Sequence, residues 1–358
     1  MRQPALDGLR GWAALVVLMT HLVAPFLAAP PLLFWLPVDG TLAVYVFFVL
    51  SGYVLSIGYL QSGDRHMLAA LAIRRYPRLT IPILASCLLA YTAQALGLMH
   101  PSMEGLPNGN TWFRALYHPD STLLSVLRFS VWEVYFDWQE SSLNPVLWTM
   151  RTELLGSFLV LGILAVTRTR SARLTATIGL TVFLAWLNSA SVGLAAGSLM
   201  AQATCWSGEG RNPDRPALPA WLIAVILLTA CSVATFRSGW LLQPAGLTAL
   251  AAAGVGCVLL SPGLCKILQT RLSRWLGMVS FPLYLTHMLV ICTWLPWVIL
   301  QLRASGMPQL PLIILSIGSS ACLALMLARA FMPVERYAIA SGRWLSARVL
   351  VPTAAATA

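Results

Sequence analysis

Long apolar runs, separated by short polar segments, follow one another along the whole chain. About ten of them reach roughly 20 residues, the length that an α-helix needs to cross a hydrocarbon core of ~30 Å. They lie at about 9–28, 41–60, 78–98, 147–167, 174–190, 192–206, 218–236, 241–260, 279–301 and 310–331. The pattern predicts an all-α integral membrane protein, a bundle of about ten transmembrane helices.

The composition supports burial in lipid. Of the 358 residues, 58% are hydrophobic and only 10% are charged, whereas a soluble domain carries about 25% charged residues. The net charge of +11 is spread over short loops, which indicates contact with anionic membrane lipids rather than with nucleic acid. The seven cysteines stand singly, so we expect neither a metal site nor a disulfide framework.

The charges of the loops predict the orientation. With a cytoplasmic N-terminus, most of the 23 basic residues fall on the cytoplasmic side, which favours both termini inside and an even number of spans. The exceptions are Arg114, Arg128, Arg151, Arg237 and Arg303. The expected organisation is a transmembrane domain over 1–340 and a cytoplasmic tail over 341–358. An extracytoplasmic loop is expected at about 100–146, in which residues 121–136 can form an amphipathic helix lying at the outer interface.

Polar residues inside the apolar runs are the candidates for chemistry. Arg10 and His21 are eleven positions apart, which is about 20° past three helical turns, so they share one face of the first helix, roughly 16 Å apart along it. Tyr284 and His287, three apart, share a face in a later span. A buried histidine in a membrane span costs insertion free energy and is by default a functional candidate. The alternative is a structural hydrogen bond to a neighbouring helix.

A carboxylate lies near the start of the fourth span. Asn144 and Pro145 form a helix-start pattern, and Glu153 follows roughly 10–14 Å inside the helix. At that depth a carboxylate must face protein or water. The alternative interpretation is an ion pair of Glu153 with Arg151 or with another helix.

A compact basic group precedes the third span. Arg74, Arg75 and Arg78 lie together at the membrane edge, with Pro77 between them. Such a group can anchor a loop to anionic lipid. A cluster of guanidinium groups also suits the phosphates of a nucleotide-bearing cofactor, because each planar fork binds phosphate through two hydrogen bonds.

Five motifs in this order resemble the membrane-bound acyltransferase family 3, the bacterial sugar O-acyltransferases. The elements are Arg10 to His21 after Asp7-Gly8-Leu9, Phe47 to Tyr53, Arg75 to Arg78, Trp148 to Glu153, and Ser280 to His287. Thr149 and Met150 replace the usual serine and leucine, and Phe281 replaces a tyrosine. The resemblance runs from about Ala5 to Tyr337. We expect the stand-alone branch of the family, which lacks a hydrolase-like domain.

The resemblance implies a multi-pass protein of the bacterial inner membrane that uses cytoplasmic acyl-CoA, usually acetyl-CoA, as donor. The implied acceptor is a saccharide hydroxyl in the envelope or outside the cell, and polysaccharide-assembly proteins are expected partners. The catalytic group would be His21, as general base or transient acyl carrier, with Arg10 and Glu153. The residues expected to bind the CoA phosphates are Arg74, Arg75 and Arg78. The residues expected on the substrate side are Trp148, Ser51, Tyr284 and His287, although Ser51-Gly52 also fits a close helix contact.

Two other functions use the same polar residues. A transporter or flippase for a lipid-linked saccharide would line a path with them, although no repeat relates the two halves of the chain. A membrane scaffold would tolerate substitution at Arg10 and at both histidines. The order of the five motifs favours the enzyme.

Overall fold

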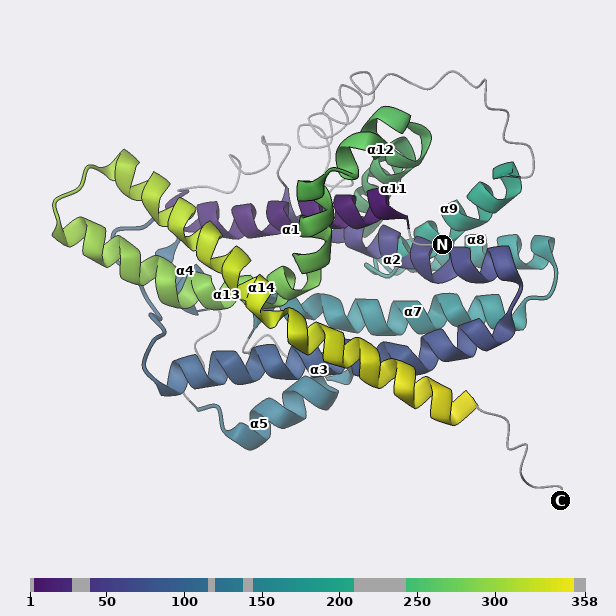
Figure 1. Cartoon of the computed structure of the whole chain (residues 1–358), viewed down its shortest axis with the longest axis horizontal. Helices are drawn as coiled ribbons and strands as arrows, with labels where there is room; N and C mark the ends of the chain where they lie inside the picture. Colours follow the sequence, from purple (N-terminus) through teal and green to yellow (C-terminus); the bar gives the residue numbers. More distant parts are fainter. Residues whose placement is uncertain (1–2, 28–38, 115–119, 138–143, 209–242, 351–358) are drawn as a thin grey trace.

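The computed structural model describes residues 3–27, 39–114, 120–137, 144–208 and 243–350, which contain helices and no strands (Figure 1). The long helices are α1 (Pro4–Val23), α2 (Gly40–Ser62), α3 (Arg65–Ala95), α7 (Trp148–Val166), α8 (Arg170–Trp186), α9 (Val192–Gly208), α11 (Pro244–Leu260), α13 (Arg271–Ala304) and α14 (Gln309–Leu350). The short pieces are η1 (Ala24–Phe26), α4 (Gly109–Arg114), α5 (Leu123–Arg128), the π-helical turn η3 (Phe129–Glu133), α6 (Val134–Phe136), η4 (Pro145–Leu147) and α12 (Pro262–Leu268).

A helix occupies every predicted span except 218–236, which lies outside the described residues. Within the described part, 5 helices are long and apolar enough to cross a membrane, or up to 6 if α11 and α12, bent by 97°, form one span. The predicted fold class, an all-helical membrane protein, is therefore confirmed. The count of ten spans and the cytoplasmic position of both termini stay predictions.

The helices do not end where the apolar runs end. The first helix was expected over 9–28 but runs from Pro4 to Val23, so His21 lies in its last turn rather than near its middle. The third helix was expected to begin at about 78, but α3 begins at Arg65 and continues through Pro77. The last helix continues through the expected boundary at 340 to Leu350. Apolar runs mark the part of a helix that suits lipid, whereas backbone hydrogen bonds extend the helix into more polar sequence.

The segment expected as an amphipathic helix at the outer interface is helical. Residues 123–136 form one continuous helical segment of α5, the π-helical turn η3 and α6. The first two parts pack along α3, and α6 packs against α7. The Tyr76 hydroxyl donates to the Val131 carbonyl at 2.7 Å, and the hydroxyls of Thr80 and Tyr135 lie 2.9 Å apart. Tyr76 is about 16 Å from the start of α3, and Thr80 is about 22 Å from its end. The segment therefore contacts the middle of α3. Its helical form is as expected, and its place at the outer interface stays a prediction.

Small residues allow α2 and α9 to pack backbone against backbone. A Cβ added at Gly52 would lie 1.9 Å from the Leu194 carbonyl oxygen, and one added at Gly197 would lie 2.0 Å from the Val49 carbonyl oxygen. Larger side chains at these positions would force the two helices apart. The close helix contact expected at Ser51-Gly52 is therefore present, and it holds Ser51 at the inner side of α2.

We expect Gly52→Ala to destabilise the bundle by about 1–3 kcal/mol, because the new methyl group meets backbone that cannot turn away. Thermal unfolding in detergent, followed by size-exclusion chromatography, measures the change. Gly162→Ala is the matched control, because nothing lies within 4 Å of the added Cβ there. Equal unfolding temperatures for the two variants would contradict the close contact.

Candidate active site

Two histidines from distant parts of the chain meet where α1 packs along α13. His21 Nδ1 and His287 Nε2 lie 2.9 Å apart, the two ring centroids are 5.1 Å apart, and the planes differ by 19°. His287 is fully buried, and its Nδ1 lies 3.0 Å from the Leu283 carbonyl oxygen of its own helix. The first and last motifs of the sequence are thus joined by a direct hydrogen bond.

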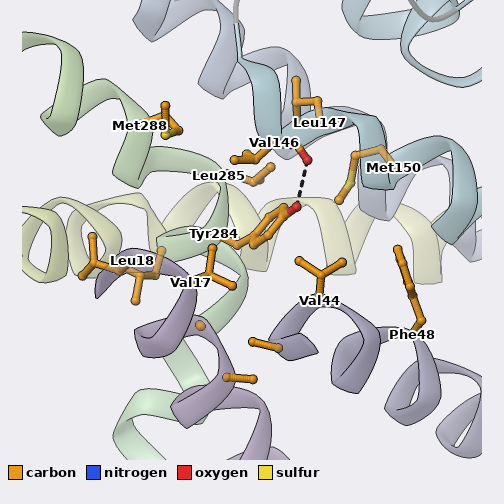
Figure 2. Packing of buried hydrophobic residues seen from close by; sticks show 14 of the residues in the cluster. Val17, Leu18, Val44, Phe48, Val146, Leu147, Met150, Tyr284, Leu285 and Met288 are labelled. Atoms are coloured by element: carbon orange, nitrogen blue, oxygen red, sulfur yellow. Dashed lines mark hydrogen bonds between the residues drawn. The ribbon is translucent and has the colours of Figure 1, made fainter. Parts of the chain in front are cut away.

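Tyr284, one turn before His287, links this pair to the start of α7. Figure 2 shows its ring among apolar side chains of α1 and α2, with the hydroxyl directed at the Val146 carbonyl. The hydroxyl donates to that carbonyl at 2.8 Å and lies 2.9 Å from Thr149 Oγ1. Threonine at position 149 therefore keeps the hydroxyl of the usual serine and uses it in this contact. Asn144 caps η4, as expected, and also donates to the Leu285 carbonyl at 2.8 Å.

Ser51, Arg75 and Glu153, from α2, α3 and α7, form a second group, which we call the polar trio. Arg75 Nη2 and Ser51 Oγ both donate to Glu153 Oε1, and Arg75 Nη2 also lies 3.2 Å from Ser51 Oγ. The Arg75 and Glu153 side chains are only 8% and 16% exposed. A carboxylate and a guanidinium so far from water need each other, because either alone would be a buried uncompensated charge.

The polar trio changes what its members can do. Glu153 is paired with Arg75 of another helix and not with Arg151, whose side chain is exposed. The Ser51 hydroxyl donates a hydrogen bond to Glu153, whose carboxylate is also engaged by Arg75. Among the described residues, Arg75 Nε is buried and has no hydrogen-bond partner.

More charged residues surround the polar trio. Arg10 lies 3.7 Å from Asp7 one turn before it on α1, and its side chain is 25% exposed. Arg10 and the exposed Arg78 both interact electrostatically with Arg75, Glu153 and Glu335. Tyr284 also interacts with Glu153, so the polar trio and the histidine pair share one region of the bundle. Arg10 and His21 both face the bundle, Arg10 toward the charged group and His21 toward α13.

Glu335 was not expected from the sequence. It lies on the part of α14 beyond the last apolar run, and only the fold brings it near Arg10 and Arg78. The single indication in the sequence is that it is the one acidic residue in the basic stretch over 329–348.

Two expected site residues lie apart from these groups. Arg74 donates from Nε to Ser346 Oγ at 2.7 Å and so joins α3 to the end of α14. Trp148 is partly exposed and packs edge-on against Phe48, with 6.3 Å between ring centroids. Their expected roles in binding CoA and the acceptor stay predictions.

One family profile, described as an acyltransferase domain (Acyl_transf_3), matches residues 3–329 and so covers nearly the whole chain. No curated protein and no solved structure matches the chain. The matched region contains the histidine pair, the polar trio, Arg10 and Arg78. The chain therefore belongs to acyltransferase family 3 and is a membrane acyltransferase.

Proposed function

We infer that the protein transfers an acyl group, acetyl by family analogy, from cytoplasmic acyl-CoA to a hydroxyl of an envelope or extracellular saccharide. The observation that carries the proposal is the hydrogen-bonded pair of His21 and the buried His287 in a family 3 acyltransferase. Acyl transfer to a hydroxyl needs a base of pKa near 7, and imidazole is the side chain that supplies it. The expected location is the bacterial inner membrane, with polysaccharide-assembly proteins as partners.

The reaction assigns a defined proton path to His21. The acceptor oxygen attacks the thioester carbonyl carbon while its proton moves to the imidazole. The C–S bond then breaks, and the CoA thiolate takes up that proton from the imidazolium and leaves as the free thiol. Arg10, roughly 16 Å from His21 along the same helix, is placed to hold a phosphate of the donor rather than the reacting carbonyl.

His21 can instead carry the acyl group itself for part of the cycle. Purified protein incubated with radiolabelled acetyl-CoA, without acceptor, distinguishes the two routes. Label bound to the protein, and released to acceptor on addition, indicates the acyl carrier. Transfer without a labelled protein indicates the general base.

Arg78, rather than Arg75, is the arginine that we expect to bind the CoA phosphates. Arg75 is engaged by Glu153, whereas the Arg78 side chain is exposed and lies near the same charged group. We expect Arg78→Ala to raise KM for acyl-CoA roughly tenfold with little change in kcat, as for loss of one charge-assisted hydrogen bond to phosphate. Arg168→Ala is the control, because Arg168 is an exposed arginine in the loop between α7 and α8. A change only in the KM of the acceptor would contradict the assignment.

The decisive experiment for the reaction compares cells with and without the protein. Mass spectrometry of envelope and secreted saccharides should show acyl groups that are missing in the deletion strain and return with the intact gene. The same purified protein should bind CoA and slowly hydrolyse acetyl-CoA. A protein that does neither, together with unchanged saccharides, would favour a transporter or a scaffold.

A further inference from the structure

The hydrogen bond between His21 and His287 has one possible donor, which follows from the contact of His287 with the Leu283 carbonyl. A carbonyl oxygen carries no proton, so the hydrogen bond between the Leu283 carbonyl and His287 requires the proton on His287 Nδ1. The neutral ring of His287 then has its lone pair at Nε2. The nitrogen that faces it, His21 Nδ1, must be the donor. The lone pair of the neutral His21 ring is therefore at Nε2.

The ring geometry agrees with a hydrogen bond in the ring plane. Nearly parallel planes, with centroids 5.1 Å apart, could also describe two stacked rings. Two nitrogens at 2.9 Å, however, are closer than the faces of stacked rings approach, and this distance is typical of a hydrogen bond. The rings thus meet edge to edge, which is the arrangement in which a proton on one ring points at the lone pair of the other.

We propose that His287 is a positioning residue that fixes His21 in the tautomer with a basic Nε2. In this proposal the Leu283 carbonyl, which can only accept, determines the donor and acceptor of both hydrogen bonds, from His287 to Leu283 and from His21 to His287. This proposal rests on the proposed function, because it gives His21 the role of base. A backbone carbonyl and a neutral imidazole here take the part that a carboxylate takes in other catalytic histidine arrangements.

The arrangement holds throughout the proposed reaction. His21 Nε2 accepts the acceptor's proton and later returns it to the CoA thiolate, while Nδ1–H remains donated to His287. The imidazolium that forms in between is stabilised by the lone pair of His287 Nε2. The opposite tautomer of His287 would place two lone pairs, or two N–H groups, against each other in the hydrogen bonds that join Leu283, His287 and His21.

The first test measures the tautomer directly. Protein labelled with ¹⁵N-histidine is reconstituted in lipid, and solid-state NMR compares it with His21→Asn to identify the His21 signals. We expect protonated Nδ1 and unprotonated Nε2 for His21, and loss of this single tautomer in His287→Leu. A wild-type His21 protonated at Nε2 alone would overturn the proposal, whatever the activity.

The second test separates positioning from general support of the fold. His287→Leu should lower kcat roughly 10- to 100-fold, in the range found for groups that orient a functional histidine, with KM for acyl-CoA near wild type. His287→Gln, whose side-chain oxygen can accept from His21 Nδ1, should recover much of that loss. Thr286→Val is the control, since this neighbour also bonds to a carbonyl of its own helix, that of Pro282 at 2.8 Å, but does not touch His21.

Two outcomes distinguish this proposal from the proposed function. Full kcat in folded His287→Leu, together with inactive His21→Asn, would overturn the positioning role alone. Full activity in His21→Asn would overturn the base and with it the proposed mechanism. Equal losses of kcat in His287→Leu, His287→Gln and Thr286→Val would show a structural role and so contradict the proposal.

Discussion

Replacing His21 by asparagine is expected to reduce acyl transfer about 10²- to 10⁴-fold, the contribution of a general base, while the protein stays folded. The asparagine amide can donate to His287 from the position of Nδ1, so the contact between α1 and α13 is kept. It has no basic nitrogen in place of Nε2, so the acceptor's proton has nowhere to go. The rate of label transfer from acetyl-CoA to saccharide, measured on purified protein in lipid nanodiscs, gives the result.

His66→Asn is the matched control, because His66 is exposed at the start of α3 and contacts the protein through its backbone nitrogen. It should leave both the transfer rate and the unfolding temperature unchanged. His21→Ala should be as inactive as His21→Asn and less stable, since it also removes the hydrogen bond to His287. Near-normal turnover in either His21 variant would end the assignment of His21 as the base.

The sequence predicted the helices well where their apolar runs are long. A run of about 20 apolar residues has few other stable structures, since a chain in lipid must satisfy its own backbone. The positions of the helix ends were less accurate, and the error matters for His21, which moved from mid-helix to the last turn of α1. Hydropathy does not record where backbone hydrogen bonding stops, and Pro77 shows that even a proline can lie inside a helix of the bundle.

The residue types of the site were predictable, but their partners were not. His21, His287, Ser51, Arg75 and Glu153 stood out because polar groups in apolar runs are costly. Which of them touch depends on how α1 packs against α13, and how α2, α3 and α7 converge, and no local pattern contains that information. Arg75 was consequently expected at a phosphate, whereas the fold pairs it with Glu153.

That pair leads to the second large effect. Arg75→Ala and Glu153→Ala are each expected to lower the free energy of unfolding by about 3–5 kcal/mol, because each leaves a buried charge without its partner. The double variant Arg75→Ala/Glu153→Ala is expected to be more stable than either single variant, since no uncompensated charge remains. Titration with SDS in mixed micelles measures the unfolding free energies, and the double-mutant cycle gives the coupling between the two residues.

The expected loss of unfolding free energy distinguishes the pair of Arg75 and Glu153 from a solvent-exposed ion pair. Arg128 and Glu133 are 2.7 Å apart, but Arg128 is 69% exposed, so Arg128→Ala should cost only about 0–1 kcal/mol. A polar contact between membrane helices averages about 0.6 kcal/mol, well below the expected effect of Arg75→Ala. If Arg75→Ala instead unfolds like wild type and raises only the KM for acyl-CoA, Arg75 binds the donor's phosphates as its sequence motif suggested. In that case the ion pair between Arg75 and Glu153 would form only in the substrate-free protein and would break when acyl-CoA binds.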